Sequence, residues 1–203
     1  MKVIAATRNR HKLTEFSRIL SPMGYEVVSQ EEVCPGIEVE EDGATFLENA
    51  RKKAVEIFRR TGMPTIADDS GLCVDALNGA PGVHSARYPD DEGDGHDDKA
   101  NNRKLLRELA GVPMEKRTAR FVSAISFAIG EGELVECEGF CQGQIAFEAL
   151  GDNGFGYDPL FLVEGGSFAS IPGEEKDRIS HRGNALRKLQ ALLEARRDGA
   201  AGR

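Results

Sequence analysis

The chain has 203 residues, which is enough to bury a hydrophobic core in one domain or in one domain with two lobes. Its formal net charge of −8 argues against a surface that coats nucleic acid, because such a surface needs a basic stripe. The first residues, MKVIAATRNR, lack the apolar run of a signal peptide, and no stretch approaches the ~20 apolar residues of a membrane span. We therefore expect a cytoplasmic protein, without a membrane or nucleic-acid polymer as partner, whose cysteines are unpaired thiols.

Strands and helices alternate in the first part of the chain. Short apolar runs are typical of buried strands, and a helix with one apolar face follows the first run. Thr45 and Glu48 form a capping box, which is a local signature of a helix start. The expected elements are strands at 2–6, 26–29 and 65–67, extended chain at 72–77, and helices that begin after residues 9 and 45, the second running to about residue 60.

The second part of the chain contains a predicted β-hairpin. Glu131-Gly132 joins two long runs that are rich in β-branched and aromatic residues. The acidic segment 89–98 lacks the register of a calcium-binding loop, so we expect a solvated loop there. Ser180 is expected to cap the last helix. The other elements are a helix at 98–110, hairpin strands at 120–129 and 134–147, and a strand at 159–163. This order predicts an α/β fold with a mixed sheet over residues 1–197, followed by a disordered tail at 198–203.

The first candidate site is the polar segment between the first strand and the first helix. A turn at a helix N-terminus offers free backbone N–H groups and the positive end of the helix dipole, and both suit phosphate. The side chains add further donors and charge, although a polar loop with an ordinary helix cap is the alternative. A P-loop pattern is absent. The residues of this segment are Thr7, Arg8, Asn9, Arg10, His11 and Lys12.

Asp68, Asp69 and Ser70 form the second candidate site. Two adjacent carboxylates directly after a buried strand are unfavourable unless something neutralises them. Ligands of open α/β sheets bind at the carboxyl ends of strands, and Mg²⁺ typically takes one or two carboxylates together with substrate phosphates. The acidic residues at 38–42 could supply a second carboxylate. An ordinary turn at Asp68 and a solvated charge run at 38–42 are the alternatives.

Two later segments could contact a flat, electron-rich ligand. In the segment 154–159, glycines flank Phe155 and Tyr157, so that a ring could approach the backbone and stack on an aromatic face. Lys176, His181 and Arg182 lie near the start of the last helix, where basic residues oppose the helix dipole. A hydrophobic core for the aromatic side chains and surface charge for the basic ones are the alternatives.

Taken together, these segments resemble the non-canonical purine NTP pyrophosphatases, also called inosine triphosphate pyrophosphatases. The similarity covers nearly the whole chain, and the segments ADDSGL, FGYDP and SHR are specific in combination. Arg8 and His11 stand where many members have glycine, while the Thr-x-Asn-x-x-Lys frame is kept. The matching segments are AATRNRHKLTEF (5–16), EEDGATFLENARKKA (40–54), ADDSGLCVDALNGAPGVHSARY (67–88), NGFGYDPLF (153–161) and EEKDRISHRGNAL (174–186).

The resemblance implies an elongated mixed sheet in a single domain with two lobes, a homodimer, and a role for each matching residue. Residues 7–12 and Lys53 resemble triphosphate contacts. Glu41 and Asp69 match the carboxylates that bind Mg²⁺, and Asp69 also matches the general base. The remaining matches are Asp68 as a supporting carboxylate, Ser70 as a substrate contact, and Phe155, Gly156, Tyr157, Asp158, Lys176, His181 and Arg182 at the nucleobase and sugar end.

The expected reaction is the hydrolysis of ITP, dITP or XTP to the monophosphate and pyrophosphate by direct attack of water. Mg²⁺ would activate the water, Asp69 would take its proton, and lysines would neutralise the departing pyrophosphate. Two alternatives are a Maf-like pyrophosphatase that acts on pyrimidine or modified nucleotides and a non-catalytic nucleotide sensor. Retention of both metal carboxylates argues against the sensor.

Overall fold

The computed structural model describes residues 1–88 and 97–201. Most of the acidic loop predicted at 89–98, together with the rejected calcium-loop pattern, lies outside these residues, as do residues 202 and 203. None of the helices in the described part of the chain is long and apolar enough to cross a membrane. The four cysteines form no disulfide, as predicted.

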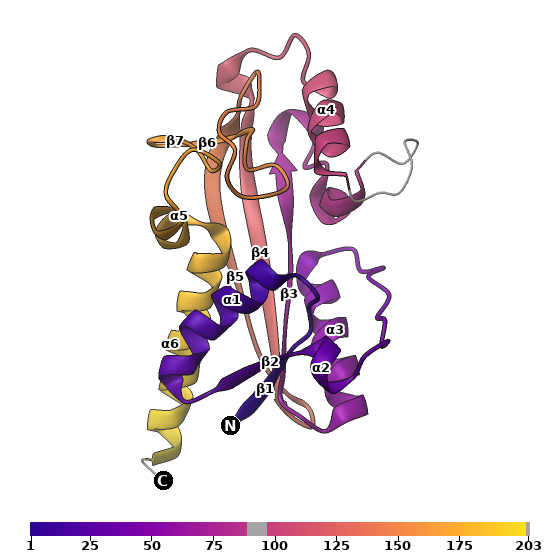
Figure 1. The fold of residues 1–203 in the computed structure, drawn as a ribbon, viewed down its shortest axis with the longest axis vertical. Coiled ribbons are helices and arrows are strands. Elements are labelled where there is room, and N and C mark those ends of the chain that lie inside the picture. Colours follow the sequence, from indigo (N-terminus) through magenta and orange to yellow (C-terminus); the bar gives the residue numbers. More distant parts are fainter. Residues whose placement is uncertain (89–96, 202–203) are drawn as a thin grey trace. The chain divides into compact units, whose positions relative to one another are not determined.

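The described strands form a seven-stranded mixed sheet in the order β2-β1-β3-β4-β5-β6-β7 (Figure 1). Strand β1 pairs in parallel with β2 and β3, whereas β6 pairs antiparallel with β5 and β7. This arrangement confirms the predicted α/β fold with a mixed sheet. The strands are β1 (Lys2–Ala5), β2 (Glu26–Ser29), β3 (Thr65–Val74), β4 (Thr118–Gly130), β5 (Glu133–Ile145), β6 (Phe161–Val163) and β7 (Gly166–Ser167).

The helices mostly begin where local sequence signals predict. Thr45 caps α3, and the side chain of Glu48 accepts hydrogen bonds from the backbone of Ala44 and Thr45, which confirms the capping box. The last helix begins directly after Ser180, also as predicted. The α-helices are α1 (Arg10–Leu20), α2 (Gln30–Val33), α3 (Phe46–Thr61), α4 (Asp98–Glu108), α5 (Gly173–Ile179) and α6 (His181–Ala201).

The chain divides into two compact units. Unit 1 contains Met1–Asp69, Ser123–Gly139 and the C-terminal segment from Arg182, and unit 2 contains Ser70–Val122 and Phe140–His181. Strands β3, β4 and β5 each contribute residues to both units.

Unit 1 has a hydrophobic core on each face of its strands, because successive side chains of a strand point to opposite faces. Val3 and Ala5 of β1 pack in one core with Phe16 of α1 and Leu186 of α6. Their neighbour Ile4 packs in the other core, which contains Ala54 and Ile57 of α3. Figure 1 accordingly shows α1 and α6 on one side of these strands and α3 on the other. The two faces are therefore distinguished by the helices that cover them.

Unit 2 has its own core, built from β3, α4, β4, β5 and the segment that contains Tyr157. Three aromatic rings form its centre, with the centroid of Phe121 4.6 Å from that of Phe161 and 5.8 Å from that of Phe168. Arg117 lies beside this core and is 2% exposed. Its guanidinium donates to the carbonyl oxygens of Leu109, Ile145 and Ala146 at 2.8–2.9 Å, so its buried charge is fully engaged by backbone.

The structure differs from the predicted elements in two respects. The strand predicted at 65–67 continues to Val74 as β3, because its polar residues find buried partners that a sequence pattern does not reveal. The short helices α2 and α5 were not predicted, since neither is long enough to show a helical period. Helix α6 is described as far as Ala201, and the domain boundary expected at residue 197 stays a prediction.

Candidate functional site

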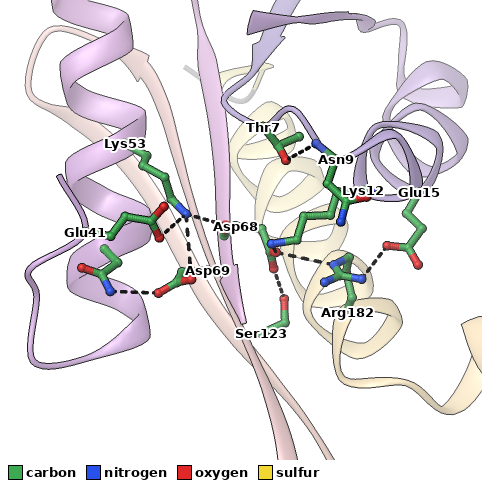
Figure 2. Close-up of polar contacts among 11 residues, drawn as sticks. Thr7, Asn9, Lys12, Glu15, Glu41, Lys53, Asp68, Asp69, Ser123 and Arg182 are labelled. Carbon is green, nitrogen blue, oxygen red and sulfur yellow. Dashed lines mark hydrogen bonds and ion pairs between the residues drawn. The ribbon is translucent and has the colours of Figure 1, made fainter. Parts of the chain in front are cut away.

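Asp68 and Asp69 lie in the middle of β3 and point to opposite faces of it (Figure 2). The alternation follows from the strand itself, since Ile66 packs with the α1 and α6 core and Ala67 packs with the α3 core. Asp68 therefore faces α1 and α6, and Asp69 faces α3. The register of β1 with β3 ends at the pair Ala5–Ile66, so Asp68 lies just beyond the carboxyl end of β1. This is where ligands bind in open α/β sheets.

Asp68 is the centre of a buried charge cluster. Its side chain is fully buried and lies 2.6 Å from Lys12 Nζ and 3.5 Å from Arg182 Nε. The hydroxyl of Ser123, from β4, donates a short hydrogen bond to the other carboxylate oxygen. Arg182 also donates to Glu15 Oε2 at 2.8 Å. The cluster thus joins the first turns of α1 and α6 to β3 and β4.

The charges of this cluster depend on one another. Burial alone would raise the pKa of Asp68, but the charges of Lys12 and Arg182, with hydrogen bonds from Lys12 and Ser123, hold that pKa well below its usual range. Burial lowers the pKa of Lys12, and Asp68 offsets only part of that effect. Burial would also lower the pKa of Arg182, but Asp68 and Glu15 raise it. Asp68 is therefore an ionised counter-charge for two cations and is poorly suited to accept a proton.

Asp69 has a different environment on the α3 face. Asn49 Nδ2 donates to Asp69 Oδ2 at 3.0 Å, and Lys53 Nζ lies 3.9 Å from Asp69 Oδ1. Lys53 also donates to Glu41 Oε2 at 2.9 Å and to the carbonyl oxygen of Asp68 at 3.0 Å. Burial raises the pKa of Asp69, although Lys53 and Asn49 oppose the shift. Asp69 is thus the more basic of the two adjacent carboxylates.

Glu41 and Asp69 form a donor set that fits a hard divalent cation. Their carboxylate oxygens converge on a single positive group, the ammonium of Lys53 (Figure 2). Within residues 1–88 and 97–201, no group of three or more His, Cys, Asp or Glu side chains is placed to hold a metal ion. A cation at Glu41 and Asp69 would therefore need further oxygen ligands, which substrate phosphates and water supply in typical Mg²⁺ sites.

The polar segment at 7–12 begins α1 through local hydrogen bonds. Thr7 Oγ1 accepts from the backbone N–H of Asn9 at 3.1 Å, and Asn9 Oδ1 accepts from that of Lys12 at 3.4 Å. The helix cap that the sequence left open as the alternative is therefore present, and phosphate binding at this segment stays a prediction. Arg8 extends to the surface, where it pairs with Glu38 at 3.2 Å, and Arg10 is also exposed. Among the side chains of this segment that the structure describes, which exclude that of His11, Lys12 reaches the buried carboxylate of Asp68.

The segment 154–158 forms a tight turn in unit 2. Gly154 has a φ of +79°, and a Cβ at this position would lie 2.1 Å from Asp158 Oδ2. That oxygen accepts from the backbone N–H of Phe155 at 2.9 Å and from Lys176 Nζ at 2.5 Å. Asp158 thus acts as the centre of the turn. Lys176 Nζ lies 5.3 Å from the centre of the Phe155 ring, which is 36% exposed.

The other predicted residues of unit 2 are held within the protein. Tyr157 is 4% exposed and donates to the carbonyl oxygen of Ser85 at 2.9 Å. His181 is 6% exposed and stacks on Phe121 with ring centres 4.7 Å apart. Gly156 donates its N–H to Asp98 Oδ2 at 2.7 Å. Phe155 therefore has a more accessible ring than Tyr157. Ser70, the residue after Asp69, is half-buried.

Three residues of the charged clusters were missed by the sequence interpretation: Glu15, Asn49 and Ser123. Glu15 and Ser123 are common polar residues in a helix and a strand, and no local pattern distinguishes them. Asn49 carried a signal, because asparagine disfavours helix interiors and this one lies four residues before Lys53, on the same helix face.

The fold and the clusters define an α/β protein with a mixed sheet in which strand β3 carries buried carboxylates facing lysine and arginine side chains. The Ham1 family model matches residues 3–192, and the chain belongs to this family. The match confirms the resemblance on which the sequence-based interpretation rests.

Curated relatives and solved structures agree with this membership. The chain is 50% identical over 195 residues to the dITP/XTP pyrophosphatase of Desulforamulus reducens, covering 95% of this chain and 96% of that protein. It is 47% identical over 196 residues to the dITP/XTP pyrophosphatase of Bacillus subtilis, covering 96% and 98%. The structure of the Staphylococcus aureus Ham1 protein matches with a TM-score of 0.88 at 40% identity, covering 97% of this chain and 100% of that one.

The buried cluster predicts a pH-dependent contribution of Asp68 to stability. Asp68→Asn should lower the free energy of unfolding at pH 7 by about 3–5 kcal/mol, because Lys12 and Arg182 lose a buried counter-charge. The folded-state pKa of Asp68 lies below the unfolded value of about 3.9. Its stabilising contribution is therefore complete above that pH and declines below it, by about 1.4 kcal/mol per pH unit.

Urea denaturation of both proteins from pH 7 to pH 3 measures this contribution. The free energy of unfolding of Asp68→Asn should approach that of the wild type only below about pH 4. Asp75→Asn is the control, because its exposed ion pair with Arg120 (3.4 Å) should contribute no more than about 1 kcal/mol. The role of Asp68 as a buried counter-charge would be contradicted if the two free energies of unfolding were similar at pH 7, or if they converged well above pH 4.

Proposed function

We propose that this protein hydrolyses non-canonical purine nucleoside triphosphates, namely ITP, dITP and XTP, to the monophosphate and pyrophosphate. The observation that carries the proposal is the pair of adjacent β3 carboxylates, one neutralised by cations and one more basic, in a chain of the Ham1 family. The full-length similarity to dITP/XTP pyrophosphatases favours this substrate class over the pyrimidine nucleotides of a Maf-like enzyme.

The triphosphate is assigned to residues of unit 1. The first turn of α1, at residues 7–12, offers backbone N–H groups and the positive end of the helix dipole. Lys12 and Lys53 add buried positive charge, with side chains 16% and 13% exposed. Both ammonium groups already lie against carboxylates, so a phosphate chain would take over part of those contacts. In the reaction the two lysines stabilise the charge that develops on the departing pyrophosphate.

Glu41 and Asp69 are the residues that would hold Mg²⁺. A bound Mg²⁺ would neutralise charge on the phosphate oxygens and favour deprotonation of water. Asp69 orients the attacking water and takes its proton, as its raised pKa suits a base better than the low pKa of Asp68. The water oxygen forms the new bond to phosphorus while the bond to the bridging oxygen between the α and β phosphates breaks, and pyrophosphate leaves with the electron pair. Asp68 supports the reaction by holding Lys12 in place.

Base recognition is assigned to Arg182 and to the turn of unit 2. Two carboxylates hold the Arg182 guanidinium, so it is a fixed donor that would pair with the 6-keto oxygen of hypoxanthine or xanthine but not with the 6-amino group of adenine. Phe155 offers an accessible ring for stacking. Tyr157, Asp158, Lys176 and His181 would contribute by fixing the surrounding backbone and rings, and Ser70 by contacting the substrate.

The proposal also includes a homodimer in the cytoplasm and one domain with two lobes over residues 1–197. The family resemblance supports the homodimer and the single domain with two lobes. Sedimentation of the purified protein would test the assembly.

Asp69→Asn is expected to abolish hydrolysis of ITP and leave the fold intact. The amide keeps the shape of the side chain but cannot accept the proton, which for a general base costs on the order of 10²–10⁴-fold in rate. Pyrophosphate release under saturating ITP and Mg²⁺ gives kcat, and circular dichroism checks the fold. Asp75→Asn serves again as the control and should keep wild-type activity. Retention of more than about a tenth of wild-type kcat would remove Asp69 from this role.

The products and the cation requirement distinguish the proposal from other hydrolases and from a nucleotide sensor. Ion-exchange analysis after incubation with ITP should show IMP and pyrophosphate in equal amounts, because the bond between the α and β phosphates breaks. Excess EDTA should stop the reaction, and Mg²⁺ should restore it, since Glu41 and Asp69 need the cation to bind phosphate. IDP as the main product, or full activity in EDTA, would refute the mechanism.

Arg182→Ala should lower kcat/KM for ITP more than for ATP, whereas Phe155→Ala should lower both in similar proportion. An unpaired buried donor costs about 1–3 kcal/mol, which corresponds to about 5- to 150-fold in the ITP:ATP ratio. Glu15→Gln is the matched control, because it removes the negative charge that faces Arg182 and keeps both a hydrogen-bond acceptor and the guanidinium. Equal losses for ITP and ATP in Arg182→Ala would assign Arg182 to holding Asp68 instead.

A further inference from the structure

Asn49 is a buried amide in the second turn of α3, with 2% of its surface exposed. Asparagine stabilises a helix less than alanine does, and a buried amide is unfavourable unless its donors and acceptor are hydrogen-bonded. Local helix formation therefore does not explain this residue, and the explanation must lie in its tertiary contacts.

The oxygen and the nitrogen of the Asn49 side-chain amide contact two different parts of the candidate site. Oδ1 accepts from the backbone N–H of Gly43 at 2.7 Å, and Nδ2 donates to Asp69 Oδ2 at 3.0 Å. The polarity of this bridge is fixed, because a backbone N–H can only donate and an ionised carboxylate can only accept. Asn49 thus ties the loop that follows Glu41 to the carboxylate of Asp69.

Gly43 is packed directly against this bridge. A Cβ at residue 43 would lie 2.6 Å from Asn49 Oδ1 and 2.8 Å from Glu48 Cβ, so any side chain there would push the loop away from α3. The close approach therefore requires glycine, and the position of the loop depends on the contact with Asn49.

Lys53 makes a second link on the same face of α3, one turn further along. Its ammonium contacts the side chains of Glu41 and Asp69, while Asn49 contacts the loop backbone and the other oxygen of Asp69. A positive charge alone would attract the two carboxylates without fixing their separation. The neutral, directional amide supplies that geometric constraint.

We propose that Asn49 is a positioning residue that holds the Glu41 loop and the Asp69 carboxylate in the fixed relation needed to bind one divalent cation together. The inference rests on the proposed function, since it takes these two carboxylates as the cation ligands. Loss of a group that orients metal ligands typically weakens metal binding by about 10- to 100-fold.

The test measures cation binding directly as well as activity. Mn²⁺ is titrated into the full-length protein without nucleotide, and free Mn²⁺ is followed by electron paramagnetic resonance. Asn49→Ala should bind Mn²⁺ about 10- to 100-fold more weakly than wild type and should need correspondingly more Mg²⁺ for half-maximal ITP hydrolysis. At saturating Mg²⁺ its KM for ITP should stay near the wild-type value, which separates cation positioning from a loss of nucleotide contacts.

Asn101→Ala is a matched control. Asn101 is also a buried helical asparagine, 1% exposed, whose side chain accepts from Tyr88 N at 3.0 Å and donates to the carbonyl oxygen of Ala86 at 3.4 Å. This variant loses a similar bridge within unit 2 and should bind Mn²⁺ as wild type does. Gly43→Ala breaks the Asn49 bridge from the loop side and should reproduce the weaker binding, which provides a second variant if Asn49→Ala does not fold.

The outcomes separate the inference from the proposed function. Wild-type Mn²⁺ affinity in folded Asn49→Ala or Gly43→Ala would overturn the inference, as would an equal loss in Asn101→Ala. Absence of ITP hydrolysis by the wild type would overturn the proposed function, while the Mn²⁺ titrations would still decide the role of Asn49.

Discussion

The alternation of side chains along β3 is the constraint on which the rest of the site depends. It sends two adjacent carboxylates, Asp68 and Asp69, to opposite faces of the central strand of unit 1. Each face is covered by helices, so each carboxylate is removed from water and needs opposite charge or hydrogen bonds to compensate for the lost hydration. The two faces provide different compensation. Asp68 meets two cations, whereas Asp69 meets an amide and a more distant ammonium.

Because of this difference, the neighbouring aspartates Asp68 and Asp69 have pKa values shifted in opposite directions. The pKa of Asp68 is lowered despite its burial, so it remains a permanent negative charge that keeps Lys12 and Arg182 at the site. The pKa of Asp69 is raised by burial, and a carboxylate with incomplete compensation is suited to accept a cation or a proton. A buried ion pair is a poor source of net stability, but removal of one partner is costly because it leaves the other charge without compensation.

Helix α3 connects local folding to the geometry of the site. The capping box at Thr45 and Glu48 fixes where the helix begins, and that start determines which face carries Asn49 and Lys53. These residues are one turn apart and therefore reach the same region of β3. A change in the cap would therefore shift the contacts of Asn49 and Lys53 together, because both side chains belong to the same rigid helix.

The sequence by itself determined the family, the mixed α/β sheet, the capping box and the residue types of the site, because these depend on periodicity and on motifs that are local in the chain. Only the tertiary structure decided that β3 continues through the aspartates and that Asp68 pairs with Lys12 and Arg182, which are 56 and 114 residues away in the sequence. It also revealed the contributions of Glu15, Asn49 and Ser123. Charge pairing and burial depend on which distant segments pack together, and no local pattern encodes that choice.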